Sequence, residues 1–177
     1  MRLPHLIIAA ILISLLLCGC KREGGERLFE IVYQPQEFEL PAGVSFPNSW
    51  VIVRQALDSR FDESLLSNGL TADEVLTVGG TFARLIALDG NDFRDLQSVA
   101  LRICPAGPEP CTELNDVFFS TDLFGRRDDV IRINPTLINF KDVVENDLFR
   151  LEVVMTPRGV TTATVRCRLE YGLQAAR

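Results

Sequence analysis

The residues that most often carry out chemistry in proteins are scarce in this chain of 177 residues, which has one histidine and five cysteines. The histidine is His5, inside an apolar N-terminal run, and only Lys21 and Lys141 supply lysines. Catalytic triads, histidine general bases and histidine-ligated metals all need an imidazole. A Schiff base or a serine–lysine pair would depend on Lys141, which reads better as a solvated lysine at the start of a helix. We therefore expect no enzyme activity.

Carboxylates are plentiful, so a carboxylate-based hydrolase stays open as an alternative, although no local spacing marks a pair. One acidic stretch offers oxygen ligands at the density that calcium prefers: Asp89, Asn91, Asp92 and Asp95. The stretch lacks the spacing of an EF-hand loop, and Asp-Gly-Asn is also common turn chemistry. We expect a turn and no cofactor here, with calcium as the alternative.

Three cysteines after residue 20 indicate how the chain is crosslinked. Cys104 and Cys111 flank the proline-rich segment 105–110, which predicts a local disulfide; two free thiols are the alternative. Cys167 lies on the apolar side of an alternating run and is expected to be a buried, inert thiol.

The N-terminus carries the most specific motif, Leu17-Cys18-Gly19-Cys20. It follows Arg2 and an apolar run that is too short to cross a bilayer, which takes roughly 20 residues. The motif resembles the lipobox of bacterial lipoproteins. This resemblance implies cleavage before Cys20, diacylglycerol on the Cys20 thiol and a further acyl chain, such as palmitate, on the new N-terminus. The alternative is an ordinary cleaved secretion signal.

The same resemblance sets the expected organisation and location. We expect a signal peptide over 1–19, a lipid-anchor linker over 20–27 and a single domain over 28–177. In bacteria with two membranes, Asp directly after the lipidated cysteine resembles an inner-membrane retention signal. This chain has Lys21 at that position, which favours the outer membrane. Loss of Arg2 with the signal changes the formal charge from −6 to −7. An acidic domain argues against nucleic acid and anionic lipid as partners.

The rest of the chain alternates apolar and polar residues in short runs separated by turn residues, which predicts strands. We expect helices over 59–68, from Thr71 and over 139–145, one helical turn over 93–97, and a stop at Gly79-Gly80. The fold class is therefore mostly β, a two-sheet antiparallel β-sandwich with two or three short helices. A closed β-barrel around an apolar ligand is the rival. The expected strands cover 28–34, 37–40, 50–54, 81–88, 99–104, 113–119, 130–133, 148–156 and 160–173.

The last two expected strands read as a hairpin around Pro157-Arg158-Gly159. A three-residue loop would place Leu151 opposite Val165 and keep both apolar faces on one side, whereas a slip by one residue would turn one face outward. The same register sets Phe149 against Cys167 and Val153 against Ala163.

These observations favour a lipid-anchored, non-catalytic binding or structural module of the cell envelope, with a protein partner in the envelope or outside the cell. Most of the eleven phenylalanines are expected in the core. The alternative is a carrier or chaperone of an apolar molecule, with phenylalanines lining a cavity. Segment 126–129, Arg-Arg-Asp-Asp, is expected to be a solvated loop, with an anion or partner contact as the alternative.

Overall fold

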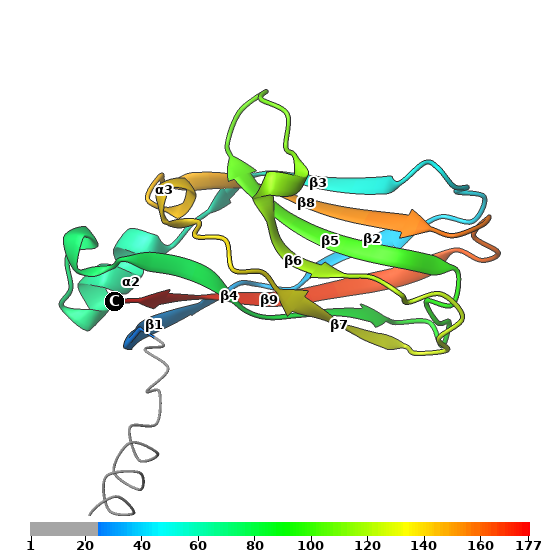
Figure 1. Ribbon diagram of the computed structural model, residues 1–177, viewed down its shortest axis with the longest axis horizontal. Coiled ribbons are helices and arrows are strands. Elements are labelled where there is room, and N and C mark those ends of the chain that lie inside the picture. Colours follow the sequence, from blue (N-terminus) through cyan, green and yellow to red (C-terminus); the bar gives the residue numbers. More distant parts are fainter. Residues whose placement is uncertain (1–24) are drawn as a thin grey trace, which may run out of the picture.

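The structure, a computed structural model, describes residues 25–177 and is mostly β, as the sequence predicts (Figure 1). Two short α-helices accompany the strands, α2 (Phe61–Asn68) and α3 (Lys141–Val144), with the 3₁₀ turns η1 (Ala72–Glu74) and η2 (Glu113–Asn115). None of the helices within residues 25–177 is long and apolar enough to span a bilayer. The strands are β1 (Arg27–Val32), β2 (Gln36–Leu40), β3 (Trp50–Asp58), β4 (Thr77–Ala87), β5 (Leu96–Pro105), β6 (Asp116–Ser120), β7 (Val130–Pro135), β8 (Leu148–Pro157) and β9 (Val165–Ala176).

These strands form one curled antiparallel sheet in the order β1-β9-β4-β7-β6-β5-β8-β3, with β2 also paired to β9. Figure 1 shows its two halves facing each other, one around β9 and β4 and the other around β5 and β8. A short β6–β7 ladder at Phe118–Pro135 and Phe119–Asn134 joins them. The two-sheet sandwich is therefore not confirmed, because the main sheet is a half-barrel.

The predicted hairpin of the last two strands is wrong. β8 pairs with β3 and β5, whereas β9 pairs with β1, β2 and β4, so the two strands lie in opposite halves of the sheet. Leu151 faces Ile103 and Arg54 instead of Val165, and Cys167 faces Phe38 and Ala87 instead of Phe149. Val153 lies across from Leu101 and Ile52, not from Ala163. The alternation correctly gave the apolar face of each strand but not its neighbour, because both strands face one core.

One local expectation also fails, and a second holds only in part. Gly79 and Gly80 do not stop a helix but lie within β4, where Gly80 leaves room for an aromatic ring. A Cβ at Gly80 would lie 2.6 Å from Cζ of Phe118, so only glycine allows this close approach. Residues 93–96 form a single hydrogen-bonded turn, in which the Leu96 N–H donates to the Phe93 carbonyl at 3.0 Å, but β5 already begins at Leu96.

The helix predictions are confirmed at their ends. Gly69 ends α2 in the left-handed conformation with φ 66°. Thr71 and Glu74 form the predicted capping box, and the Asn139 side-chain oxygen accepts the N–H of Lys141 at 3.0 Å at the start of α3. Phe61 and Leu65 of α2 are buried, whereas Leu66 is 83% exposed.

The core lies between the two halves of the curled sheet. Large side chains such as Leu85, Leu101 and Leu169 have no exposed surface there. Tyr33 stacks on Tyr171 with ring centroids 4.8 Å apart, and it donates its hydroxyl to the Ser59 carbonyl at 2.8 Å. The interior is thus filled by the chain's own side chains.

Side chains, not a backbone ladder, close the open side of the half-barrel. The edge of β1 and β2 lies across from β3 and its following turn, and carbonyls of that edge accept hydrogen bonds from side chains of the opposite strand. Such capping blunts an edge that could otherwise pair with another chain. The three bonds are Trp50 Nε1 to the Glu39 oxygen at 3.1 Å, Arg54 to the Glu37 oxygen at 3.0 Å and Arg60 to the Val32 oxygen at 3.3 Å.

Candidate functional site

The strongest candidate for a functional surface is the end of the molecule farthest from where the described chain begins. β9 runs the length of the sheet, with Arg27 paired near its end at Ala176 and Leu40 paired at its start, Val165. The eleven steps between the first and last residues of this strand, at about 3.3 Å each, separate these ends by about 36 Å. The loops at the far end, on the right in Figure 1, join β2 to β3, β4 to β5, β6 to β7 and β8 to β9.

Three of these loops expose large apolar side chains. Phe46 is 63% exposed, Phe124 48% and Val160 59%. Arg158 connects the two aromatic residues: its guanidinium carbon lies 4.8 Å from the centre of the Phe124 ring, and it shares with Phe46 the lining of a hollow of about 520 Å³. We call Phe46, Phe124, Arg158 and Val160 the distal surface. Exposed aromatic and aliphatic groups that gather around an arginine are typical of protein interfaces.

Backbone contacts hold the loops of this surface together. Ser45 and Val160 form an isolated antiparallel bridge, and the N–H of Phe46 donates to the Gly159 carbonyl at 3.2 Å. Thr161 is buried and donates its hydroxyl to the Pro41 carbonyl at 2.8 Å. The β2–β3 and β8–β9 loops therefore form one connected unit, and the distal surface is preorganised.

The residues considered for calcium lie beside this surface, but their side chains are already engaged. Asp95 accepts the N–H and the hydroxyl of Thr162, both at 2.7 Å. Asp92 forms an ion pair with Arg94 at 2.6 Å. Within residues 25–177, no group of three histidine, cysteine, aspartate or glutamate side chains is arranged to hold a metal ion.

The side chains of Asp89 and Asn91 are also engaged, in hydrogen bonds to the backbone near the start of β9. Asp89 accepts the backbone N–H of Arg166 at 3.1 Å, and this bond lowers the pKa of the Asp89 carboxyl. Asn91 donates to the Thr164 carbonyl at 3.2 Å. The expected turn chemistry is what the structure has, and its function here is to tie the β4–β5 loop to the start of β9.

The predicted disulfide between Cys104 and Cys111 is present, and it closes a loop that projects from β5. The Arg150 side chain, 6% exposed as a residue, donates to the carbonyls of Gly107 and Glu109 at 2.5 Å each and so anchors this loop on the outer face of the sheet. No local pattern signals this contact, because Arg150 lies in a strand more than 40 residues from the loop.

The other residues named from the sequence have the following positions and contacts. Cys167 is a free and fully buried thiol, and burial raises its pKa to about 12. Lys141 pairs with Glu145 at 3.2 Å at the start of α3. Cys20, the predicted lipid site, lies outside the described residues. In the described chain, Asp122 is also notable for a left-handed backbone, with φ 59° in the β6–β7 loop.

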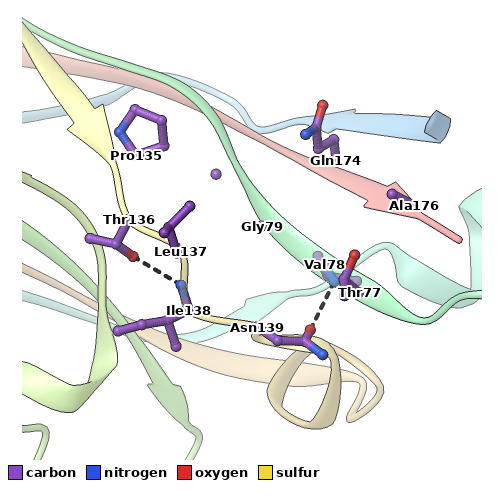
Figure 2. Close-up of a pocket in the computed structure, with 11 residues that line it drawn as sticks. Thr77, Val78, Gly79, Pro135, Thr136, Leu137, Ile138, Asn139, Gln174 and Ala176 are labelled. Atoms are coloured by element: carbon purple, nitrogen blue, oxygen red, sulfur yellow. Dashed lines mark hydrogen bonds between the residues drawn. The ribbon is translucent and has the colours of Figure 1, made fainter. Parts of the chain in front are cut away.

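A second hollow, of about 360 Å³, lies beside β4 where β7 turns away (Figure 2). Asn139 spans it, accepting the N–H of Val78 at 2.9 Å and donating to the Leu76 carbonyl at 3.1 Å. Figure 2 shows Pro135 and Leu137 on the same segment as Asn139, across from Gly79 of β4 and Gln174 of β9. The polar groups of Asn139 hold the loop, and the other polar side chains that line this hollow belong to Thr77, Thr136 and Gln174.

Sequence reasoning missed the distal surface because it assigned phenylalanines to the core. Phe29, Phe61, Phe118 and Phe149 are indeed buried. Phe46 lies in a segment with no alternation, Val-Ser-Phe-Pro, between two expected strands. An aromatic residue in a turn, outside any apolar stripe, was the available signal.

A comparison with known protein families finds no match for this chain, and a comparison with curated proteins finds none either.

Proposed function

We propose that this protein is a lipid-anchored, non-catalytic binding module of the bacterial cell envelope that docks a protein partner on its distal surface. The observation that carries the proposal is the placement of Arg158 between Phe46 and Phe124, with exposed Val160 two residues further along and bridged to Ser45. Burial of such aromatic and arginine groups is what dominates the affinity of protein interfaces.

The position of the surface supports the proposed topology. The described chain begins at Gly25, beside the C-terminal Arg177, whose N–H donates to the Glu26 carbonyl at 3.0 Å. The distal surface is at the opposite end of β9. With lipid on Cys20 and a tether from Lys21 to Gly25 that would reach about 17 Å when extended, the anchor would hold one end near the membrane and leave the other free. We place the anchor in the outer membrane where two membranes exist.

A protein partner fits this surface better than a charged polymer or lipid. The β6–β7 loop carries Arg126 and Arg127 followed by Asp128 and Asp129, so its charge is balanced. The chain as a whole is acidic, at −6. Nucleic acid and anionic headgroups both need a net positive face, which the balanced loop does not supply.

Two further observations support a binding module over the alternatives. His5 precedes the proposed cleavage site, so the mature chain would have no imidazole. The interior between the halves is filled by side chains such as Leu101 and Leu151, which have no exposed surface. A carrier would need a chamber there for its apolar cargo.

The proposal can be tested by site-specific photo-crosslinking in intact cells. A photoreactive phenylalanine analogue replaces Phe124, and in a matched control it replaces Leu66, which is 83% exposed but lies on α2 near the opposite end. We expect an adduct of one defined mass from position 124 only, weakened when Arg158→Ala is added. The same adducts from both positions, or none from position 124, would refute the docking surface.

The anchor is tested separately. Cys20→Ser should move the protein from the membrane fraction to the soluble fraction, since the acyl chains supply the membrane affinity. Unchanged membrane retention would contradict the lipid anchor and leave the docking experiment intact.

A further inference from the structure

A second surface, on the outer face of β6, β5 and β8, has the pattern of a ligand site. The inward residues of β5, including Val99, Leu101 and Ile103, are fully buried, so the alternate residues face outward. The register sets these outward residues in three rows, each separated from the next by two residues of strand, about 7 Å. The rows are Ser98 with Thr156, Ala100 with Phe119 and Val154, and Arg102 with Asp116 and Glu152.

The middle row is an apolar floor with an aromatic side. Ala100 is 5% exposed, and Phe119 is 43% exposed although its neighbour Phe118 is fully buried in the core. A hollow of about 380 Å³ opens over this row, within the range of small-molecule sites. The Phe119 ring is therefore available to a ligand at no cost to the core.

Polar groups stand at both ends of the floor. At one end Ser49 and Thr156 share a hydrogen bond of 2.7 Å between their hydroxyls, and Ser98 adds a third hydroxyl. At the other end the Nε of Arg102 donates to Asp116 at 2.7 Å, and both side chains are more than four-fifths buried. Within residues 25–177, the terminal nitrogens of Arg102 donate no hydrogen bond, so their N–H groups are free for a ligand.

The charge of the site selects among ligands. Glu113 and Asp116 line the hollow with a single arginine, Arg102, so the balance is negative. Burial is the largest cause that raises the pKa of the Asp116 carboxyl, and the negative charge of Glu113 raises it further, so additional negative charge is unfavourable at this end of the groove. A phosphate or a sugar acid is therefore disfavoured relative to a neutral ligand.

We propose that this groove, lined by Ser49, Ser98, Arg102, Asp116, Phe119 and Thr156, binds a neutral sugar ring of an oligosaccharide. A pyranose has an apolar C–H face, which would pack on Phe119 and the Ala100–Val154 floor. Its edges carry hydroxyls that both donate and accept, which matches the serine and threonine hydroxyls at one end and the Arg102–Asp116 pair at the other. The site lies on the sheet face, and the proposal does not rest on the distal surface.

The test is a calorimetric titration of the whole protein, solubilised in a detergent without a sugar headgroup. The probes are neutral hexose and N-acetylhexosamine oligomers of four to six units, with a uronic acid oligomer as the anionic arm. We expect at least one neutral series to bind, and Phe119→Ala to weaken that binding at least fivefold. Val53→Ala is the matched control, since Val53 is 39% exposed opposite Glu152 on the same sheet but lines no part of the groove, and it should change affinity less than twofold.

Several outcomes would overturn the proposal. One is no heat of binding from any neutral series at millimolar concentration. Others are binding that Phe119→Ala leaves unchanged, and equal loss in Phe119→Ala and Val53→Ala. Preferential binding of the uronic acid oligomer would contradict the charge argument and with it the neutral-sugar assignment. Circular dichroism of each variant shows whether the fold is kept, and Ser98→Ala provides a second, smaller change within the groove.

Discussion

The buried tyrosine pair predicts two opposite effects from the same chemical change. Tyr33 and Tyr171 stack in the core, but only the Tyr33 hydroxyl has a partner, the carbonyl of Ser59 at 2.8 Å. Within residues 25–177 the Tyr171 hydroxyl has no hydrogen-bond partner, and the residue is 1% exposed. We expect Tyr171→Phe to stabilise the protein and Tyr33→Phe to destabilise it.

The magnitudes follow from the cost of burying an unpaired polar group, about 1–3 kcal/mol. Tyr171→Phe removes that cost but loses the packing of one oxygen atom, a few contacts of about 0.1–0.2 kcal/mol each. The net gain should be about 1 kcal/mol. Tyr33→Phe removes a donor and leaves the Ser59 carbonyl unpaired, so the loss should be about 1–2 kcal/mol.

Guanidinium unfolding measures both, followed by the fluorescence of Trp50, the single tryptophan of the chain. The midpoint should rise for Tyr171→Phe and fall for Tyr33→Phe at an unchanged slope. For a chain of this size, a change of 1 kcal/mol also shifts the thermal midpoint by about 2–4 °C. Destabilisation by Tyr171→Phe of 1 kcal/mol or more would show that its hydroxyl is satisfied, and would refute the reasoning.

Three further predictions test other parts of the core and the loops. Gly80→Ala should destabilise the protein by about 1–3 kcal/mol in the same unfolding assay, because its Cβ would lie 2.6 Å from the Phe118 ring, whereas Gly79→Ala meets open space and should cost much less. Cys167 should resist a thiol reagent at pH 8 in the native protein and react fully in denaturant, since it is buried with a pKa of about 12; rapid native labelling would contradict its burial. Because the pKa of the Asp89 carboxyl is lowered by folding, its contribution to stability is present above the unfolded-state pKa near 3.8 and is lost as the pH falls through the folded value. Asp89→Asn should therefore reduce the difference between the free energies of unfolding at pH 7 and pH 3. An unchanged difference would exclude this contribution.

The sequence predicted local structure better than long-range pairing. Alternation around Phe29 and Leu101 correctly gave strands and their buried faces, because the period of two is a local property. Gly69 and the Thr71–Glu74 pair likewise marked helix ends through local hydrogen bonds. These features depend on neighbours a few residues away, which a single sequence displays.

The pairing of β8 and β9 shows where this reasoning stops. A strand with an apolar face can lie beside any other strand that lines the same core. Alternation alone therefore predicts a hairpin at the short segment between Pro157 and Val165, although this segment crosses between the halves of the sheet. The disulfide was readable because its cysteines are seven residues apart. The contact of Arg150 with the disulfide loop and the distal surface both join segments far apart in the chain, so the sequence alone did not predict them.

The position of β9 has a consequence for how the protein acquires its structure. β9 is made last among the described strands, yet it is the direct neighbour of β1, β2 and β4. Until Val165–Ala176 has left the ribosome, those three strands lack a partner on that side, and β1 waits for a strand more than 130 residues away. Such non-local pairing slows folding. The half of the sheet around β9 therefore forms late, after the strands around β5 and β8 are already able to pair.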